Sequence, residues 1–174
     1  MRLKPVPEPP GSLDAVDEVR SALPLVPSSE DDCCARVLQR THVEARDEAR
    51  TWITFCQALD LAAEHESGFA RTREDVPRDA LPERFLTGVF AAREVLAALA
   101  EADEPLAPAA VLDDIEDVVP RWERSRYDDW RADWTERVWR LLEWTVLLGL
   151  AERADGEGER YRAIEGDRAP TGET

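Results

Sequence analysis

Residue types that metal binding, redox chemistry and secreted folds depend on are scarce in this chain of 174 residues. It contains two histidines, three cysteines and one methionine. An odd number of cysteines cannot all pair within one chain, so a disulfide framework is not expected and a reducing compartment is favoured. No Cys-x2-Cys or His-x3-His spacing is present, so we predict no metal site. The default interpretation of Cys33 and Cys56 is small core residues.

The motifs of common enzyme classes are also missing. There is no phosphate-binding loop, no nucleophile elbow and no His-Glu-x-x-His helix. Only carboxylates remain for acid–base chemistry, and they are too numerous for any pair to be informative. We therefore predict no catalytic residues and no cofactor.

Neither a membrane span nor a signal peptide is predicted. The chain has no run of 18 apolar residues, the length that a helix crossing a membrane requires. Its first eleven residues, MRLKPVPEPPG, are proline-rich and lack an apolar segment. We therefore expect a cytoplasmic protein that starts at Met1 and has no membrane partner.

Acidic charge, by contrast, is abundant. Asp and Glu total 38 against 22 for Lys and Arg, which gives a formal net charge of −16, and Lys4 is the single lysine. This composition resembles that of proteins from salt-in halophilic archaea, whose acidic surfaces stay hydrated in concentrated salt. At low salt such a charge repels nucleic acid. At about 1 M salt the Debye length falls to about 3 Å, so the repulsion no longer acts at range.

The apolar pattern predicts the same order of elements in each half of the chain. In the first half, helical periodicity and capping residues indicate helices over about 12–23, 29–40 and 43–59, the last opened by a Thr41–Glu44 capping box. A polar turn within 59–72 then predicts a two-stranded hairpin.

In the second half, we expect helices over about 81–102 and 108–119. A longer helix comes next, opened by a Ser125–Asp128 capping box and ending near Leu147. Asp155-Gly156 then predicts the turn of a second hairpin.

The two halves also align in sequence. At an offset of 89 residues, LDLA at 59–62 lies over LGLA at 148–151 and Phe55 lies over Trp144. Three helices followed by a hairpin resemble a winged-helix domain, over about residues 12–76 and 83–165. The resemblance implies a mainly α fold with small β-hairpins, formed by two tandem winged-helix units packed together. The alternative is an unrelated helical bundle with two chance hairpins.

This resemblance sets the expected domain organisation. A flexible tail covers residues 1–11, the first unit covers 12–78 and the second covers 79–165. Residues 166–174 show no periodicity and are predicted to form a disordered tail.

The winged-helix resemblance also implies a DNA-binding, transcription-regulator-type function. In that fold the third helix enters the major groove and the hairpin, or wing, contacts the backbone. The second unit carries acidic residues along its third helix, where an arginine is more often part of a solvated ion pair. The first unit is therefore favoured, and its candidate DNA-binding residues are Arg46, Arg50, Arg71 and Arg73.

A protein–protein adaptor is the alternative function. Five of the six tryptophans lie between residues 122 and 144, and they cannot all face one side of a helix. Aromatic residues beside arginines are enriched in protein interfaces, although they also fill cores and unit junctions. The expected partner is thus double-stranded DNA or a protein, with a homodimer as one option. The candidate partner-binding residues are Trp122, Arg126, Trp139 and Arg140.

Overall fold

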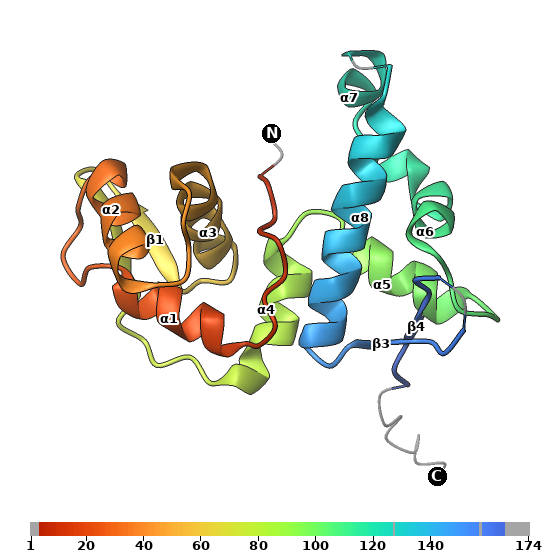
Figure 1. Cartoon of the computed structure of the whole chain (residues 1–174), viewed down its shortest axis with the longest axis horizontal. Coiled ribbons are helices and arrows are strands. Elements are labelled where there is room, and N and C mark those ends of the chain that lie inside the picture. The colour runs from red at the N-terminus through yellow and green to blue at the C-terminus, as the bar shows by residue number, and fades with distance from the viewer. Residues whose placement is uncertain (1–3, 127, 157, 166–174) are drawn as a thin grey trace, which may run out of the picture. The chain divides into compact units, whose positions relative to one another are not determined.

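A computed structural model describes residues 4–126, 128–156 and 158–165 of the chain (Figure 1). The chain divides into two compact units between Arg93 and Glu94. Residues 79–93, which the sequence predicts in the second unit, therefore group with the first. Within the described ranges, no helix is long and apolar enough to cross a membrane. The tail expected over 166–174 lies outside the described residues.

The first unit has the predicted order of three helices and a hairpin. These are α1 (Asp14–Ala22), α2 (Glu30–Arg40) and α3 (Arg46–Ala58), followed by the antiparallel strands β1 (Ala62–His65) and β2 (Gly68–Arg71). A short 3₁₀ helix, η1 (Arg78–Ala80), and α4 (Leu81–Gly88) complete the unit. Ser28, just before α2, exchanges two backbone hydrogen bonds with Phe69 of β2, of 3.0 and 2.8 Å. It therefore adds a third, one-residue strand to the wing.

The second unit repeats this order with an insertion. Helix α5 (Ala92–Glu101) and α6 (Pro108–Asp114) correspond to α1 and α2, and α8 (Trp130–Leu147) corresponds to α3. The 3₁₀ helix η2 (Glu116–Val118) and α7 (Arg121–Arg126) are inserted between α6 and α8. The hairpin is β3 (Ala151–Arg153) and β4 (Tyr161–Ala163). Here too a residue two positions before the second helix, Leu106, exchanges two 2.9 Å hydrogen bonds with the aromatic residue of the return strand, Tyr161.

The 89-residue offset extends to the backbone geometry where each third helix ends. Asp60 and Gly149 both adopt left-handed backbone, with φ of 58° and 75°. The next residue donates to a carbonyl five residues earlier in both units, at 2.8 Å in each. This 6→1 hydrogen bond is the Schellman motif, which ends a helix and redirects the chain. The internal repeat is thus confirmed in three dimensions.

The prediction of a single helix over 81–102 is wrong, because the helix is interrupted between Gly88, where α4 ends, and Ala92, where α5 begins. Ala91 adopts left-handed backbone, with φ of 69°, which no α-helix accommodates. Gly88 lies so close to α3 that a Cβ on it would be 1.8 Å from the carbonyl oxygen of Ala58. A tertiary contact therefore accompanies the end of α4, and the apolar periodicity on either side does not reveal it.

Two of the predicted capping boxes are also wrong. Helix α3 begins at Arg46 with Ala45 as its N-cap, and neither residue of the Thr41–Glu44 box caps it. Ser125 lies inside α7, a helix that the sequence did not predict, and its hydroxyl donates to the Trp122 carbonyl. By contrast, Ser29 caps α2 and accepts a 3.1 Å hydrogen bond from the Asp32 N–H.

Candidate nucleic-acid and partner interfaces

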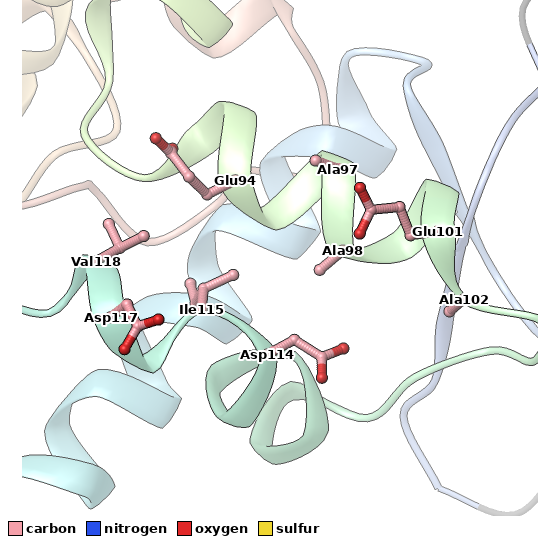
Figure 2. A pocket seen from close by; sticks show the side chains of 9 residues that line it. All are labelled: Glu94, Ala97, Ala98, Glu101, Ala102, Asp114, Ile115, Asp117 and Val118. Atoms are coloured by element: carbon pink, nitrogen blue, oxygen red, sulfur yellow. The ribbon is translucent and has the colours of Figure 1, made fainter.

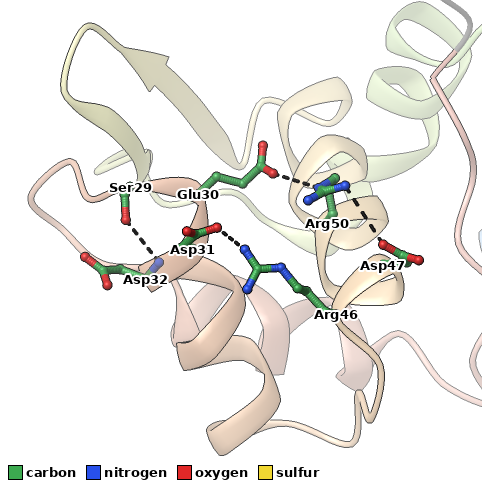
Figure 3. Close-up of polar contacts among 7 residues, drawn as sticks. All are labelled: Ser29, Glu30, Asp31, Asp32, Arg46, Asp47 and Arg50. Carbon is green, nitrogen blue, oxygen red and sulfur yellow. Dashed lines mark hydrogen bonds and ion pairs between the residues drawn. The ribbon is translucent and has the colours of Figure 1, made fainter.

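Helix α3 is the recognition-helix position of the first unit, and its amphipathic pattern determines which side chains are available. Ala49, Trp52, Ile53 and Cys56 form its buried face. Arg46 and Arg50, one turn apart, lie on the exposed side near the helix start (Figure 3).

Both arginines of this face are paired with carboxylates. Arg46 contacts Asp31, and Nε of Arg50 donates to Oε1 of Glu30 at 2.7 Å (Figure 3). A weaker pair, at 3.9 Å, joins Arg50 to Asp47 one turn earlier on α3. Since three carboxylates surround two guanidinium groups, this surface carries no excess positive charge. The sequence did not indicate the α2 partners, which lie 15 and 20 residues away along the chain.

The wing arginines lie at the base of the hairpin. Arg71 is opposite Ala62 at the open end of the β1–β2 ladder, whereas His65 and Gly68 form its closed end. The Arg71 N–H donates to the Pro24 carbonyl at 2.9 Å. Arg73 comes two residues later, on the exposed surface. The tip itself carries Glu64 and Glu66, so the wing end that would reach DNA is acidic.

An arginine of α1 holds the segment that comes after the wing. Nη2 of Arg20 donates to the carbonyls of Thr72 and Glu74, at 3.1 and 2.5 Å. These two bonds attach the base of the wing to α1 and set the path of the chain on either side of Arg73.

The third helix of the second unit shows the same neutralisation. Arg131 contacts Asp113 of α6 and also pairs with Glu116 at 3.3 Å. Arg140 pairs with Glu136 on its own helix at 3.1 Å. In both units, therefore, arginines of the third helix are held by carboxylates of the segment that precedes it.

A buried carboxylate ties the second wing to its helix. Glu143 of α8 has a side chain only 9% exposed, and Oε1 accepts a 2.5 Å hydrogen bond from the Tyr161 hydroxyl. Arg153 of β3 binds the same carboxylate with both Nε and Nη2. Burial, followed by the contact with Glu143, raises the pKa of Tyr161. The corresponding wing residue in the first unit is Phe69, so this polar contact belongs to the second unit alone.

The predicted partner-binding residues differ in accessibility. Trp122 of α7 is 45% exposed, and Arg126 at the end of the same helix is exposed. Trp139 is half-buried, and Arg140 is half-buried and paired with Glu136. The accessible part of this predicted surface is therefore α7.

The neighbouring tryptophans belong to the interior of α8. Trp134 and Trp144 are buried. The Arg137 guanidinium lies 5.5 Å from the Trp134 ring centroid, and burial lowers the pKa of Arg137 to about 10. Much of the aromatic cluster seen in the sequence thus fills the core.

The three thiols are buried, and burial raises the pKa of each, that of Cys56 to about 12. They are therefore protonated near neutral pH. Across the described ranges, no three His, Cys, Asp or Glu side chains are grouped so as to hold a metal ion.

The family model described as "Halobacterial double winged helix domain" matches residues 1–165. The chain belongs to this family. The match confirms two predictions from the sequence, the two winged-helix units and the resemblance to halobacterial proteins. No curated protein and no solved structure matches the chain. The family match therefore establishes the fold and the halobacterial family of this double winged helix domain.

Proposed function

We propose that this double winged helix protein is a transcription-regulator-type protein that binds double-stranded DNA through its first unit. The observation that carries the proposal is the placement of Arg46 and Arg50. They lie one turn apart on the exposed face of α3, the third helix of the unit, which is followed by the wing. In winged-helix proteins that bind DNA, the third helix enters the major groove. Arg71 and Arg73 would add phosphate contacts from the base of the wing.

The ion pairs of these arginines are weak enough to be exchanged. The Arg46 and Arg50 side chains are 52% and 50% exposed. Exposed pairs of this kind contribute about 1 kcal/mol or less, and salt weakens them further. A phosphate or a guanine edge can replace a carboxylate at modest cost, because it offers the same bidentate acceptor geometry. Concentrated salt also screens the repulsion between DNA and the acidic surface.

The test is fluorescence polarisation with random-sequence duplex DNA, in potassium chloride from about 0.2 to 3 M. We expect binding that weakens with salt, and Arg46→Ala/Arg50→Ala should reduce affinity at least tenfold. Arg131→Ala/Arg162→Ala is the matched control, because it removes two similarly exposed, ion-paired arginines from the second unit and should leave the affinity unchanged. Circular dichroism at each salt concentration confirms that the protein is folded. Equal loss in both double variants, or no binding by folded protein, would contradict the proposal.

Protein binding is a second candidate function, and it is favoured by the exposure of Trp122. Trp122 is the one aromatic residue among the large apolar side chains that are exposed in the described parts of the chain. Arg126 lies one turn later on the same helix and is also exposed. Tryptophan and arginine are the residue types that most often dominate binding energy in protein interfaces.

A further inference from the structure

A groove with an apolar floor and acidic walls crosses the second unit. It has a volume of about 570 Å³ and lies between α5 on one side and α6 with η2 on the other (Figure 2). Two of its lining residues, Ala98 and Ile115, are buried and form its apolar floor. The carboxylates on its walls are Glu94, Glu101, Asp114 and Asp117.

Among the described residues, these four carboxylates have no basic partner within ion-pair distance. No ion pair to any of them is present within residues 4–126, 128–156 and 158–165, although many other acidic residues of the protein are paired with arginine. The groove is therefore a negative surface around an apolar strip, which complements a positively charged segment that carries a large apolar side chain.

The first unit has a hollow at the corresponding place, but with a different character. Asp17, Glu18, Ser21, Ala22 and Arg40 line it between α1 and α2. Arg40 comes three residues after the buried Val37 of α2, and Val118 comes three residues after the buried Ile115. The first unit thus places an arginine where the second places valine. Among the described residues, Asp17 pairs with Arg78 and Glu18 with His42, so the hollow of the first unit has partnered carboxylates and an arginine, unlike the groove of the second unit.

Helix α7 has the complementary chemistry. Its sequence, RWERSR, carries three arginines and one glutamate around the exposed Trp122. Arg121 and Arg126 are exposed. Among the described residues, α7 is also an insertion that has no counterpart in the first unit. The groove and its complement are therefore both present in the second unit and both absent from the first.

We propose that the second unit forms a homodimer in which α7 of each copy, with Trp122 as the anchor, occupies the acidic groove of the other. In a two-fold interface the same surface of each copy faces itself, so it must be self-complementary. The second unit meets this requirement because α7 is basic and aromatic whereas the groove is acidic and apolar. A two-fold dimer therefore contains two equivalent contacts, each between α7 of one copy and the groove of the other. In this dimer the protein partner of Trp122 is a second copy of the chain, and the contact does not require DNA binding.

The first experiment is sedimentation equilibrium of the full chain at concentrations up to about 1 mM, in about 0.3 and 2 M potassium chloride. We expect a monomer–dimer equilibrium that persists at high salt, since apolar burial does not depend on charge. Trp122→Ala should weaken it at least tenfold, as loss of an interface anchor does. Val118→Arg, which gives the groove the residue found in the first unit, should also weaken it.

A mixing experiment tests whether the groove and α7 contact each other. Asp114→Lys/Asp117→Lys and Arg121→Glu/Arg126→Glu should each be monomeric alone, because each places like charges across the interface. Mixed in equal amounts they should form a heterodimer, since the reversed groove then faces the reversed helix and the two native surfaces face each other. Glu64→Lys/Glu66→Lys in the first wing makes the same change in net charge as the groove variant, and it should dimerise like the wild type.

The outcomes separate this inference from DNA binding. A monomeric wild type at the highest concentration overturns the dimer, as does a dimer that the Trp122, groove and α7 variants leave intact. Failure of the two charge-reversed variants to associate on mixing overturns the proposed contact. DNA affinity of the same variants, measured by polarisation, reports on the proposed function separately.

Discussion

Replacing Gly88 with alanine separates what local propensity predicts from what the tertiary structure predicts. Gly88 is the last residue of α4 and is not among the glycines with positive φ. Helix propensity alone predicts that alanine stabilises such a position by up to about 1 kcal/mol. The structure predicts the opposite sign, because the new Cβ would be 1.8 Å from the Ala58 carbonyl oxygen and 2.8 Å from its carbon.

The magnitude depends on how far the backbone must move. Both neighbouring atoms belong to the main chain of α3, so no side-chain rotation relieves the overlap. Restoring ordinary contact requires α4 to shift away from α3, which also disturbs the Phe55–Phe85 contact, with ring centroids 6.4 Å apart, between the same two helices. Overpacking of this kind costs about 1–3 kcal/mol and sometimes more. We expect Gly88→Ala to lower the free energy of unfolding by about 3 kcal/mol.

The assay is urea denaturation in potassium chloride, monitored by circular dichroism. Gly149→Ala is the control, because Gly149 has positive φ and open space around the position of a Cβ, so its cost is conformational and should be about 1 kcal/mol. Equal or greater stability of Gly88→Ala would refute the close approach of α4 to α3. A larger loss for Gly149→Ala than for Gly88→Ala would refute the ranking of steric overlap above backbone strain.

Two further predictions concern a wing and a helix cap. Tyr161→Phe should cost about 1–3 kcal/mol at pH 7, because it removes a donor from the buried Glu143 carboxylate, and unchanged stability in urea denaturation would contradict this. The pKa of Tyr161 is raised in the folded protein, so the stabilisation by its protonated hydroxyl is fully present below the unfolded pKa of about 10 and is lost as the pH rises above that value. Tyr161→Phe lacks this titrating group, so the variant should lose less stability than the wild type between pH values of about 9 and 11. Ser29→Ala should lower the free energy of unfolding by about 1 kcal/mol through loss of the α2 N-cap, whereas Ser125→Ala, which removes no cap, should be nearly neutral in thermal denaturation.

Part of the candidate interface is predictable from sequence periodicity. A four-residue spacing places Arg46 and Arg50 on one face of a helix, and the apolar stripe that begins at Ala49 and continues through Trp52 and Ile53 identifies the opposite, buried side. Their carboxylate partners on α2 were not predictable, because α2 and α3 are brought together by packing of their apolar faces. The same reason applies to Glu143. Nothing in the sequence distinguishes it from the many acidic residues of the surface, and only the tertiary structure shows that it is buried against Tyr161.

Local sequence information was sufficient for the winged-helix order, the internal repeat and the two hairpins. The helices and hairpins depend on periodicity and turn residues, which are visible in neighbouring positions, and the repeat depends on comparing the sequence with itself at an offset of 89 residues. The end of α4, the pairing of the arginines and the exposure of a single tryptophan required the tertiary structure. So did the groove between α5 and α6. Each of these depends on atoms from segments far apart in sequence, whose approach is set by how the apolar faces of whole elements pack together.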